Sequence, residues 1–140
     1  MKKILIVEDD QKIAMALSIR LKANGYNPTV AADAIAGASQ ARIFKPDLIL
    51  LDISMPGGNG FQLAETFLRM PETNGTPFVF ITASKKPELQ EKVIASGAAG
   101  LFEKPFDTEK LLHFIDVNFK RDAEMSSAMQ NSAVGKSLRL

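Results

Sequence analysis

The sequence has 140 residues, the size of one ordinary domain with a sizeable core. A hydrophobic fraction of 46%, a charged fraction of 24% and a formal net charge of +1 indicate a globular protein, with no electrostatic reason for direct nucleic-acid binding. The absence of cysteine excludes disulfides and zinc–thiolate sites. No apolar stretch reaches the length of a membrane span, and the N-terminal apolar run is too short for a signal peptide. We therefore expect a cytoplasmic protein.

Short apolar runs, rich in β-branched and aromatic residues, predict five strands along the chain. These runs lie at residues 4–7, 27–31, 48–51, 78–81 and 101–102. The third run is apolar throughout and ends at Asp52, which is typical of a strand buried on both faces of a parallel sheet. The second run contains Pro28, which favours a position at the edge of the sheet.

Segments with apolar residues three or four positions apart separate and follow these runs, and they predict five helices. The first starts after Asp10 and stops at Asn24-Gly25, and the others span about 34–44, 61–70, 87–97 and 108–119. Strands that alternate with helices indicate an α/β protein with a doubly wound parallel sheet and right-handed crossovers.

The last part of the chain, from Lys120 onward, shows no sustained apolar period. We therefore expect one domain over residues 1–120, followed at 121–140 by a mobile tail or an extension of the final helix. About twenty residues are too few for an output domain, so none is expected here.

Polar side chains follow four of the predicted strands, at the point where each strand ends. They are Asp9 and Asp10, Asp52, Thr82 and Lys104. A parallel sheet brings the carboxyl ends of its strands to one edge, so we expect these side chains to lie together. Clustered carboxylates favour a hard cation such as Mg²⁺, and a hydroxyl and an ammonium suit phosphoryl oxygens. The pattern predicts magnesium-assisted phosphoryl chemistry with one carboxylate as the nucleophile.

Several short motifs in this order and spacing resemble the receiver domain of response regulators in two-component signalling, over about residues 2–120. The motifs are Glu8-Asp9-Asp10, Asp52 followed by Met55-Pro56 and Gly60, Thr82-Ala83, and Lys104-Pro105-Phe106. The resemblance implies a flavodoxin-like (βα)5 fold with strand order 2-1-3-4-5. It also implies a phosphoacceptor switch rather than an enzyme.

The resemblance further implies a Mg²⁺ site at this edge of the sheet. The implied ligands are Asp9, Asp10, Asp52 and the backbone carbonyl of Ser54, with Asp10 as the more direct ligand and Asp9 acting largely through water. Glu8 is expected to be a peripheral solvated charge.

In the same resemblance, Asp52 is the phosphoacceptor, Thr82 senses the phosphoryl group, and Lys104 pairs with Asp52 before phosphorylation and with the phosphoryl group afterwards. Leu101 stands where many receivers carry the Tyr or Phe of an aromatic switch. The implied partners are a sensor histidine kinase or a histidine phosphotransfer protein, and a target protein on the face of the fourth helix, fifth strand and fifth helix. We expect a monomer or weak dimer without direct contact to nucleic acid or membrane.

Two other functions are compatible with parts of this pattern. An aspartate-nucleophile phosphatase or phosphotransferase of the haloacid-dehalogenase type needs a second Asp two residues after the nucleophile, where this chain has Ser54. A degenerate receiver would act as an interaction module without taking phosphate, which the presence of all five polar residues disfavours.

Overall fold

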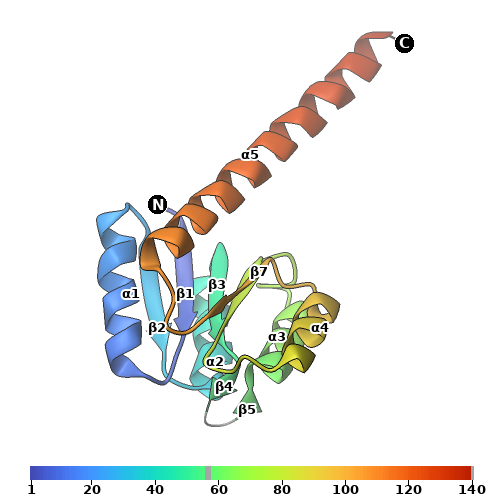
Figure 1. Ribbon diagram of the computed structural model, residues 1–140. Helices are drawn as coiled ribbons and strands as arrows, with labels where there is room; N and C mark the ends of the chain where they lie inside the picture. The colour runs from blue at the N-terminus through green and yellow to red at the C-terminus, as the bar shows by residue number, and fades with distance from the viewer. Residues whose placement is uncertain (56–57, 140) are drawn as a thin grey trace. The chain divides into compact units, whose positions relative to one another are not determined.

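In the computed structural model, which describes residues 1–55 and 58–139, five parallel strands form one sheet (Figure 1). The strands are β1 (Lys3–Val7), β2 (Asn27–Ala31), β3 (Leu48–Asp52), β6 (Phe78–Thr82) and β7 (Gly100–Glu103). Their order across the sheet is β2-β1-β3-β6-β7. Counted along the chain this is 2-1-3-4-5, so the expected topology and the edge position of the strand with Pro28 are confirmed.

The helices of the α/β pattern are α1 (Gln11–Ala23), α2 (Ala34–Phe44), α3 (Gly60–Arg69), α4 (Pro87–Ser96) and α5 (Thr108–Arg139). A two-stranded antiparallel hairpin of β4 (Ser54–Met55) and β5 (Gly58–Asn59) follows β3. Pro56 and Gly57, which join these two strands in the sequence, lie outside the described residues.

Side chains of the central strands are buried on both faces of the sheet, as the apolar run at 48–51 predicts. One face, with Leu5, Leu51 and Phe80, packs in a single apolar cluster with residues of α2, α3 and α4. The alternate residues of the strands point to the opposite face because strand side chains alternate. On the described strands they include Ile4, Ile6, Leu48, Leu50 and Val79, all with 0% exposure.

Local signals in the sequence explain where the helices begin and end. The Asn59 side chain accepts a hydrogen bond from the Gln62 N–H and forms a capping box with it at the start of α3. Pro87 occupies the first turn of α4, where its missing N–H costs nothing. Gly97 ends that helix at a φ of 81°, a left-handed conformation that glycine adopts without strain.

The chain divides into two compact units, Met1–Pro105 and Phe106–Leu140. The second unit contains α5, a helix of 32 residues that continues well past the end at about residue 119 that its apolar pattern predicted. Its buried residues Leu111, Leu112 and Ile115 lie in its first turns, and the described side chains from Lys120 to Ala128 are exposed. Residues 121–140 were expected to form either a mobile tail or an extension of the final helix. The described part of this segment is helical and continues α5.

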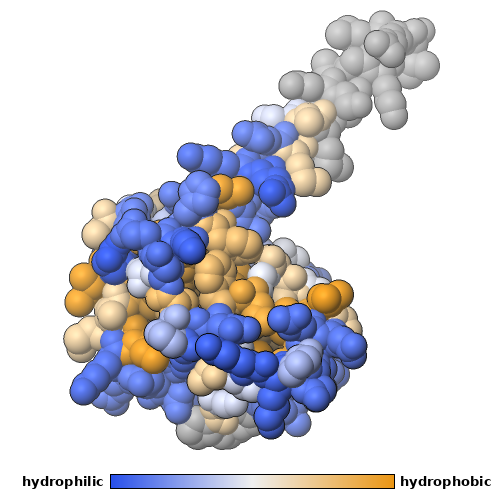
Figure 2. Space-filling model, in the orientation of Figure 1, coloured by the Kyte–Doolittle hydropathy of each residue, from blue (hydrophilic) through white to orange (hydrophobic). Residues whose placement is uncertain are grey.

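The surface mixes hydrophilic and apolar residues on the face that Figure 2 shows. The large apolar side chains that are exposed, such as Met15, Ile19, Ile35 and Ile94, are spread over α1, α2 and α4. Among the residues that the structure describes, no helix combines the length and the apolar character that crossing a bilayer requires.

Candidate functional site

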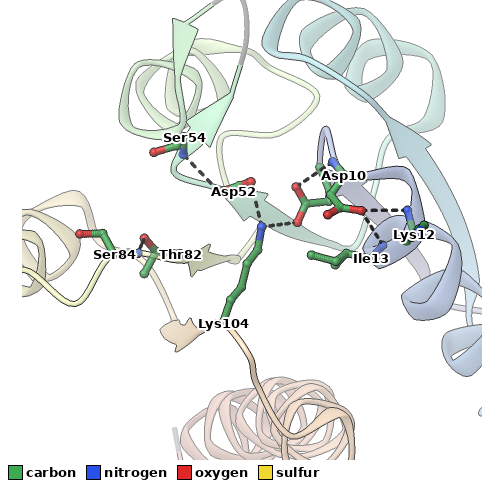
Figure 3. Close-up of polar contacts among 9 residues, drawn as sticks. Asp10, Lys12, Ile13, Asp52, Ser54, Thr82, Ser84 and Lys104 are labelled. Carbon is green, nitrogen blue, oxygen red and sulfur yellow. Dashed lines mark hydrogen bonds and ion pairs between the residues drawn. The ribbon is translucent and has the colours of Figure 1, made fainter.

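Asp52, the last residue of β3, lies at the carboxyl edge of the sheet and is only 4% exposed. Its two oxygens have different partners: Oδ1 accepts a hydrogen bond from the Ser54 N–H at 3.2 Å, and Oδ2 accepts one from the Lys104 ammonium at 3.1 Å (Figure 3). Because the strand is central in the sheet, its end is held on both sides by β1 and β6. The carboxylate is therefore fixed in place rather than freely rotating in solvent.

Lys104 follows β7 directly and extends its side chain toward Asp52 (Figure 3). Its backbone N–H donates to the Thr82 carbonyl at 2.7 Å, which ties the start of the side chain to the end of β6. The Nζ atom lies 3.1 Å from Asp52 Oδ2 and 2.6 Å from Glu8 Oε1, so one ammonium faces two carboxylates. Burial alone would lower the pKa of Lys104, but hydrogen bonding to Glu8 and Asp52 raises it above its usual value. The expected pairing with Asp52 is confirmed, and the bond between Lys104 and Pro105 is cis.

Glu8 is 2% exposed, so the expectation of a peripheral solvated charge is wrong. Burial raises the pKa of its carboxyl to about 7, and hydrogen bonding to Asp52 adds to this, while hydrogen bonding to Lys104 opposes it. Its Oε2 accepts a hydrogen bond from the Asp10 N–H at 3.3 Å. Oε1 lies 2.6 Å from the Lys104 ammonium, so each oxygen of Glu8 has a partner in this site.

Three carboxylates converge at this edge, and they are not the three that the sequence pattern indicated. Glu8, Asp9 and Asp52 each offer an oxygen, and these atoms all lie within 4.8 Å of one another. The carboxylate of Asp10 instead caps α1, accepting hydrogen bonds from the N–H groups of Lys12 and Ile13 at 3.0 and 3.2 Å (Figure 3). The cap uses Oδ1 of Asp10 to satisfy free N–H groups at the start of the helix, and the ligand role expected for Asp10 stays a prediction.

Thr82 ends β6 beside this cluster and is 2% exposed. Its Oγ1 accepts a hydrogen bond from the Ser84 N–H at 3.0 Å (Figure 3). Ser84 Oγ accepts one from the Lys86 N–H at 3.4 Å. The hydroxyl hydrogen of Thr82 remains available to a ligand oxygen, since the described contact uses the oxygen only as an acceptor. Thr82 therefore supplies a donor at the strand edge that also carries Asp52.

Gly60, the first residue of α3, packs directly behind the carboxylate cluster. Its N–H donates to the Ile53 carbonyl at 2.7 Å, and a Cβ built on it would overlap the backbone oxygen of Asp52 and lie 2.9 Å from Ile53 Cα. Only glycine fits at this contact, which holds the start of α3 against the backbone of Asp52.

Replacing Gly60 by alanine should lower the free energy of unfolding by about 1–3 kcal/mol, because the new methyl group must displace backbone. The measurement is urea denaturation followed by circular dichroism. Gly75→Ala is the matched control, because a Cβ there meets no atom within 4 Å and the residue has no positive φ. Equal stability of the two variants would contradict the tight contact at Gly60.

A comparison with protein families matches residues 4–116 to the response regulator receiver domain. The chain belongs to this family. Asp52, Thr82 and Lys104 all lie inside the matched range, as do the carboxylates of Glu8 and Asp9. The receiver domain is the phosphoacceptor part of two-component signalling systems, so this identification also gives the chain its general role.

Among curated proteins, this receiver is similar to longer regulators. It is 33% identical over 136 residues to the DNA-binding dual master transcriptional regulator RpaA of Synechocystis, and the match covers 96% of this chain and 56% of that protein. It is 33% identical over 125 residues to the phosphate regulon transcriptional regulatory protein PhoB of Escherichia coli, covering 89% and 55%. The chain thus spans about half the length of the curated relatives it matches.

Among solved structures, the receiver is similar to proteins of its own size. The chemotaxis protein CheY4 of Vibrio cholerae superposes with a TM-score of 0.78 at 31% identity, covering 83% of this chain and 97% of that one. A CheY-like receiver domain protein of Methanospirillum hungatei superposes with a TM-score of 0.83 at 26% identity, covering 89% and 98%. These matches agree with the fold described above.

Reasoning from the sequence missed Glu8 as part of the receiver site. The available signal was its position directly after the apolar run at 4–7, because the first residue past a buried strand is still held by the sheet. Its backbone N–H donates to the Ala31 carbonyl of β2 at 3.0 Å, so the ladder continues through Glu8. Asp10 lies two residues further and has already entered the α1 cap.

Leu101 of β7 lies beside Phe80 of β6 in the register of the sheet and packs against the apolar cluster. It is only partly buried and carries no polar atom on its side chain. The aromatic position of many receivers is therefore filled here by an aliphatic residue that already belongs to the core.

Proposed function

We propose that this receiver takes a phosphoryl group onto Asp52 from a phosphohistidine of a partner protein, in a reaction that requires Mg²⁺. The observation that supports the proposal is the pairing of the buried Asp52 with Lys104 beside the carboxylates of Glu8 and Asp9. A buried carboxylate that contacts one ammonium and lies among other acids is a nucleophile in an environment suited to phosphate.

In the transfer step, an oxygen of Asp52 forms a bond to phosphorus as the phosphorus–nitrogen bond of the donor breaks. The electron pair of that bond goes to the imidazole nitrogen, which takes a proton from solvent. The product is an acyl phosphate on Asp52. Lys104 is already 3.1 Å from the carboxylate, so its ammonium can follow the charge onto the transferred oxygens with little movement.

The residues at this edge fit a magnesium ion. Glu8, Asp9 and Asp52 bring carboxylate oxygens within 4.8 Å of one another, and one ammonium, that of Lys104, faces two of these acids. Oxygen ligands of this kind, few in number, are typical of magnesium sites that share the ion with a phosphate. We propose that Asp9 and Asp52 hold the ion, with Glu8 and the backbone carbonyl of Ser54 beside them. When bound, Mg²⁺ would neutralise the charge that develops on the phosphoryl oxygens.

After transfer, Thr82 and Lys104 would hold the phosphoryl oxygens and so change their own surroundings. To donate its hydroxyl hydrogen to a phosphoryl oxygen, Thr82 would turn its hydroxyl toward Asp52 while the same oxygen accepts from the Ser84 N–H. The loop that begins at Ser84 therefore responds to the state of Asp52. This response would alter the face formed by α4 and β7, where we propose that a target protein binds in a phosphorylation-dependent manner.

We propose a sensor histidine kinase or a histidine phosphotransfer protein as the donor, acting in the cytoplasm. The matched regulators RpaA and PhoB carry names that describe transcriptional regulation. Because this chain spans about half of their length, regulation of transcription by this chain is not part of the proposal.

Asp52→Asn should abolish phosphoryl uptake, whereas the parent protein should gain one phosphoryl group from acetyl phosphate or a phosphohistidine donor only when Mg²⁺ is present. Intact-protein mass spectrometry measures the gain. Asp47→Asn is the matched control, because Asp47 lies just before the opposite end of the same strand and accepts a hydrogen bond from the Lys3 N–H. Uptake by Asp52→Asn at the parental rate would refute the assignment.

The two neighbouring acids Asp9 and Asp10 should respond differently to amide replacement. Asp9→Asn removes a charge from the carboxylate cluster and should weaken Mg²⁺ binding at least about tenfold. Asp10→Asn should leave magnesium affinity within a few fold of the parent, with a stability change below about 1 kcal/mol, since Asn is also a good helix cap. Isothermal titration and thermal melts in chelator measure both. If Asp10→Asn lost magnesium affinity as strongly as Asp9→Asn, Asp10 would be a ligand of the ion.

A further inference from the structure

Phe61 lies between Gly60, which packs on the backbone of Asp52, and a groove at the outer surface of the molecule. It follows Gly60 in the chain, so its backbone is fixed by the contact between Gly60 and the backbone of Asp52 and Ile53. A shift of the Asp52 backbone cannot be absorbed at Gly60, because the contact leaves no free space there. Such a shift is passed to Phe61.

The Phe61 ring also contacts the strand that carries Thr82. Its centroid lies 4.9 Å from that of Phe80, with the two rings tilted by 54°. Phe80 lies two residues before Thr82, and its neighbours in the sheet register are Leu51 on one side and Leu101 on the other. Phe61 is therefore connected to β3 through the neighbouring Gly60 and to β6 through an aromatic pair whose geometry is specific.

On its other side, the half-buried Phe61 lines a groove between α3 and α4 with a volume of about 430 Å³. Leu68 of α3 and Ala95 of α4 lie along this groove, and Lys92 of α4 places its ammonium 6.0 Å from the centroid of the Phe61 ring. Lys92 gives the ring a second partner besides Phe80. The ring thus contacts the core through Phe80 and the surface through Lys92.

We propose that Phe61, rather than the residue at position 101, is the aromatic element that couples the state of Asp52 to the surface, and that the α3–α4 groove changes with phosphorylation. This inference rests on the proposed phosphorylation of Asp52. The position where many receivers carry an aromatic ring holds Leu101, which is aliphatic, half-buried and beside Phe80 in the sheet. A signal shifts a conformational equilibrium only by its differential interaction with the two states. Phe61 has one partner in the core and one at the surface, so its ring is better placed than Leu101 to transmit the state of Asp52.

The first experiment follows side-chain and amide signals by NMR during titration with beryllium fluoride and Mg²⁺, a mimic of the phosphoryl group. In the parent protein we expect shifts at Asp52 and Thr82 and also at the Leu68 methyl groups and the Lys92 and Ala95 amides. In Phe61→Leu the shifts at Asp52 and Thr82 should remain and those in the groove should shrink. Phe44→Leu should keep both sets, because Phe44 is also half-buried with a lysine ammonium 5.6 Å from its ring centroid, but belongs to α2 and contacts Lys3.

A second experiment tests the coupling in the reverse direction and does not depend on the ring as a reporter. Coupling between two sites is reciprocal, so filling the groove with Ala95→Leu should change the half-saturating beryllium fluoride concentration by about fivefold or more. The same substitution in the Phe61→Leu background should have no effect. Ala16→Leu, at an exposed position of α1, is the control and should leave the parent affinity unchanged.

The outcomes separate the two proposals. An equal effect of Ala95→Leu in both backgrounds, or no effect in either, overturns the role of Phe61 while leaving phosphorylation of Asp52 intact. The role of Phe61 is also overturned if, in the parent protein, the signals of Asp52 and Thr82 shift and those of the groove do not. A parent protein in which beryllium fluoride moves no signal at Asp52 overturns the proposed function and the coupling together.

Discussion

Replacing Lys104 by methionine is expected to lower the free energy of unfolding of the metal-free receiver by about 3–5 kcal/mol at pH 8, because two buried carboxylates lose the cation that pairs with both of them. Glu8 and Asp52 are 2% and 4% exposed, and the Lys104 ammonium lies 2.6 and 3.1 Å from their oxygens. Methionine fills a similar volume, so the loss reports on charge rather than on packing. Urea denaturation in the presence of a chelator measures the difference.

The size of this loss should depend on pH and on magnesium. At pH 5.5 Glu8 carries a proton in the folded state and no longer repels Asp52, so the deficit of Lys104→Met should become smaller. Magnesium should restore part of the stability, since an ion that binds only the folded state stabilises it. Lys86→Met, at an exposed lysine before α4, is the control and should change stability by less than about 0.5 kcal/mol. A Lys104 variant as stable as this control would show that the ion pairs have no net effect.

Glu8→Gln is expected to stabilise the metal-free receiver at pH 8 by about 3 kcal/mol relative to its effect at pH 4.5. The folded state raises the pKa of Glu8 from 4.5 to about 7, so the folded protein holds the proton more tightly than the unfolded chain does. The parent therefore has the full benefit of this proton below about pH 4.5 and loses it as the pH rises to about 7. Glutamine does not titrate, so the variant should not show this loss.

The measurement is the difference in unfolding free energy between parent and variant at several pH values in chelator. Taking the difference removes the contribution of the other carboxylates, which titrate in both proteins. Glu103→Gln, at an exposed glutamate of β7, should show no comparable change with pH. A pH-independent difference for Glu8→Gln would mean that Glu8 titrates in the folded protein as it does in the unfolded chain.

Both predictions depend on the burial of Glu8, which was expected from the sequence to be a solvated charge. Local sequence patterns did not predict the environment of this side chain. The bounds of α2 and the strands at 27–31 and 78–82 could be predicted closely, because apolar period, caps and prolines act over a few residues. The pairing of Lys104 with Asp52 could also be predicted, since parallel strands bring their carboxyl ends to one edge. What the sequence does not contain is the direction in which each of three consecutive acids points.

Two sets of hydrogen bonds decide the side-chain directions in Glu8-Asp9-Asp10, one to a neighbouring strand and one to the start of α1. The first acid continues the ladder of β1 through its bond to Ala31, which turns its side chain into the interior toward Lys104. The third is drawn into the cap of α1, because unpaired N–H groups at a helix start bind the nearest carboxylate. The length of α5 was likewise not visible in its apolar period, because the described side chains from 120 to 128 are exposed. The sequence by itself determined the order of elements and the set of reacting residue types. Only the folded chain determined which carboxylates share an ammonium and which one ends as a helix cap.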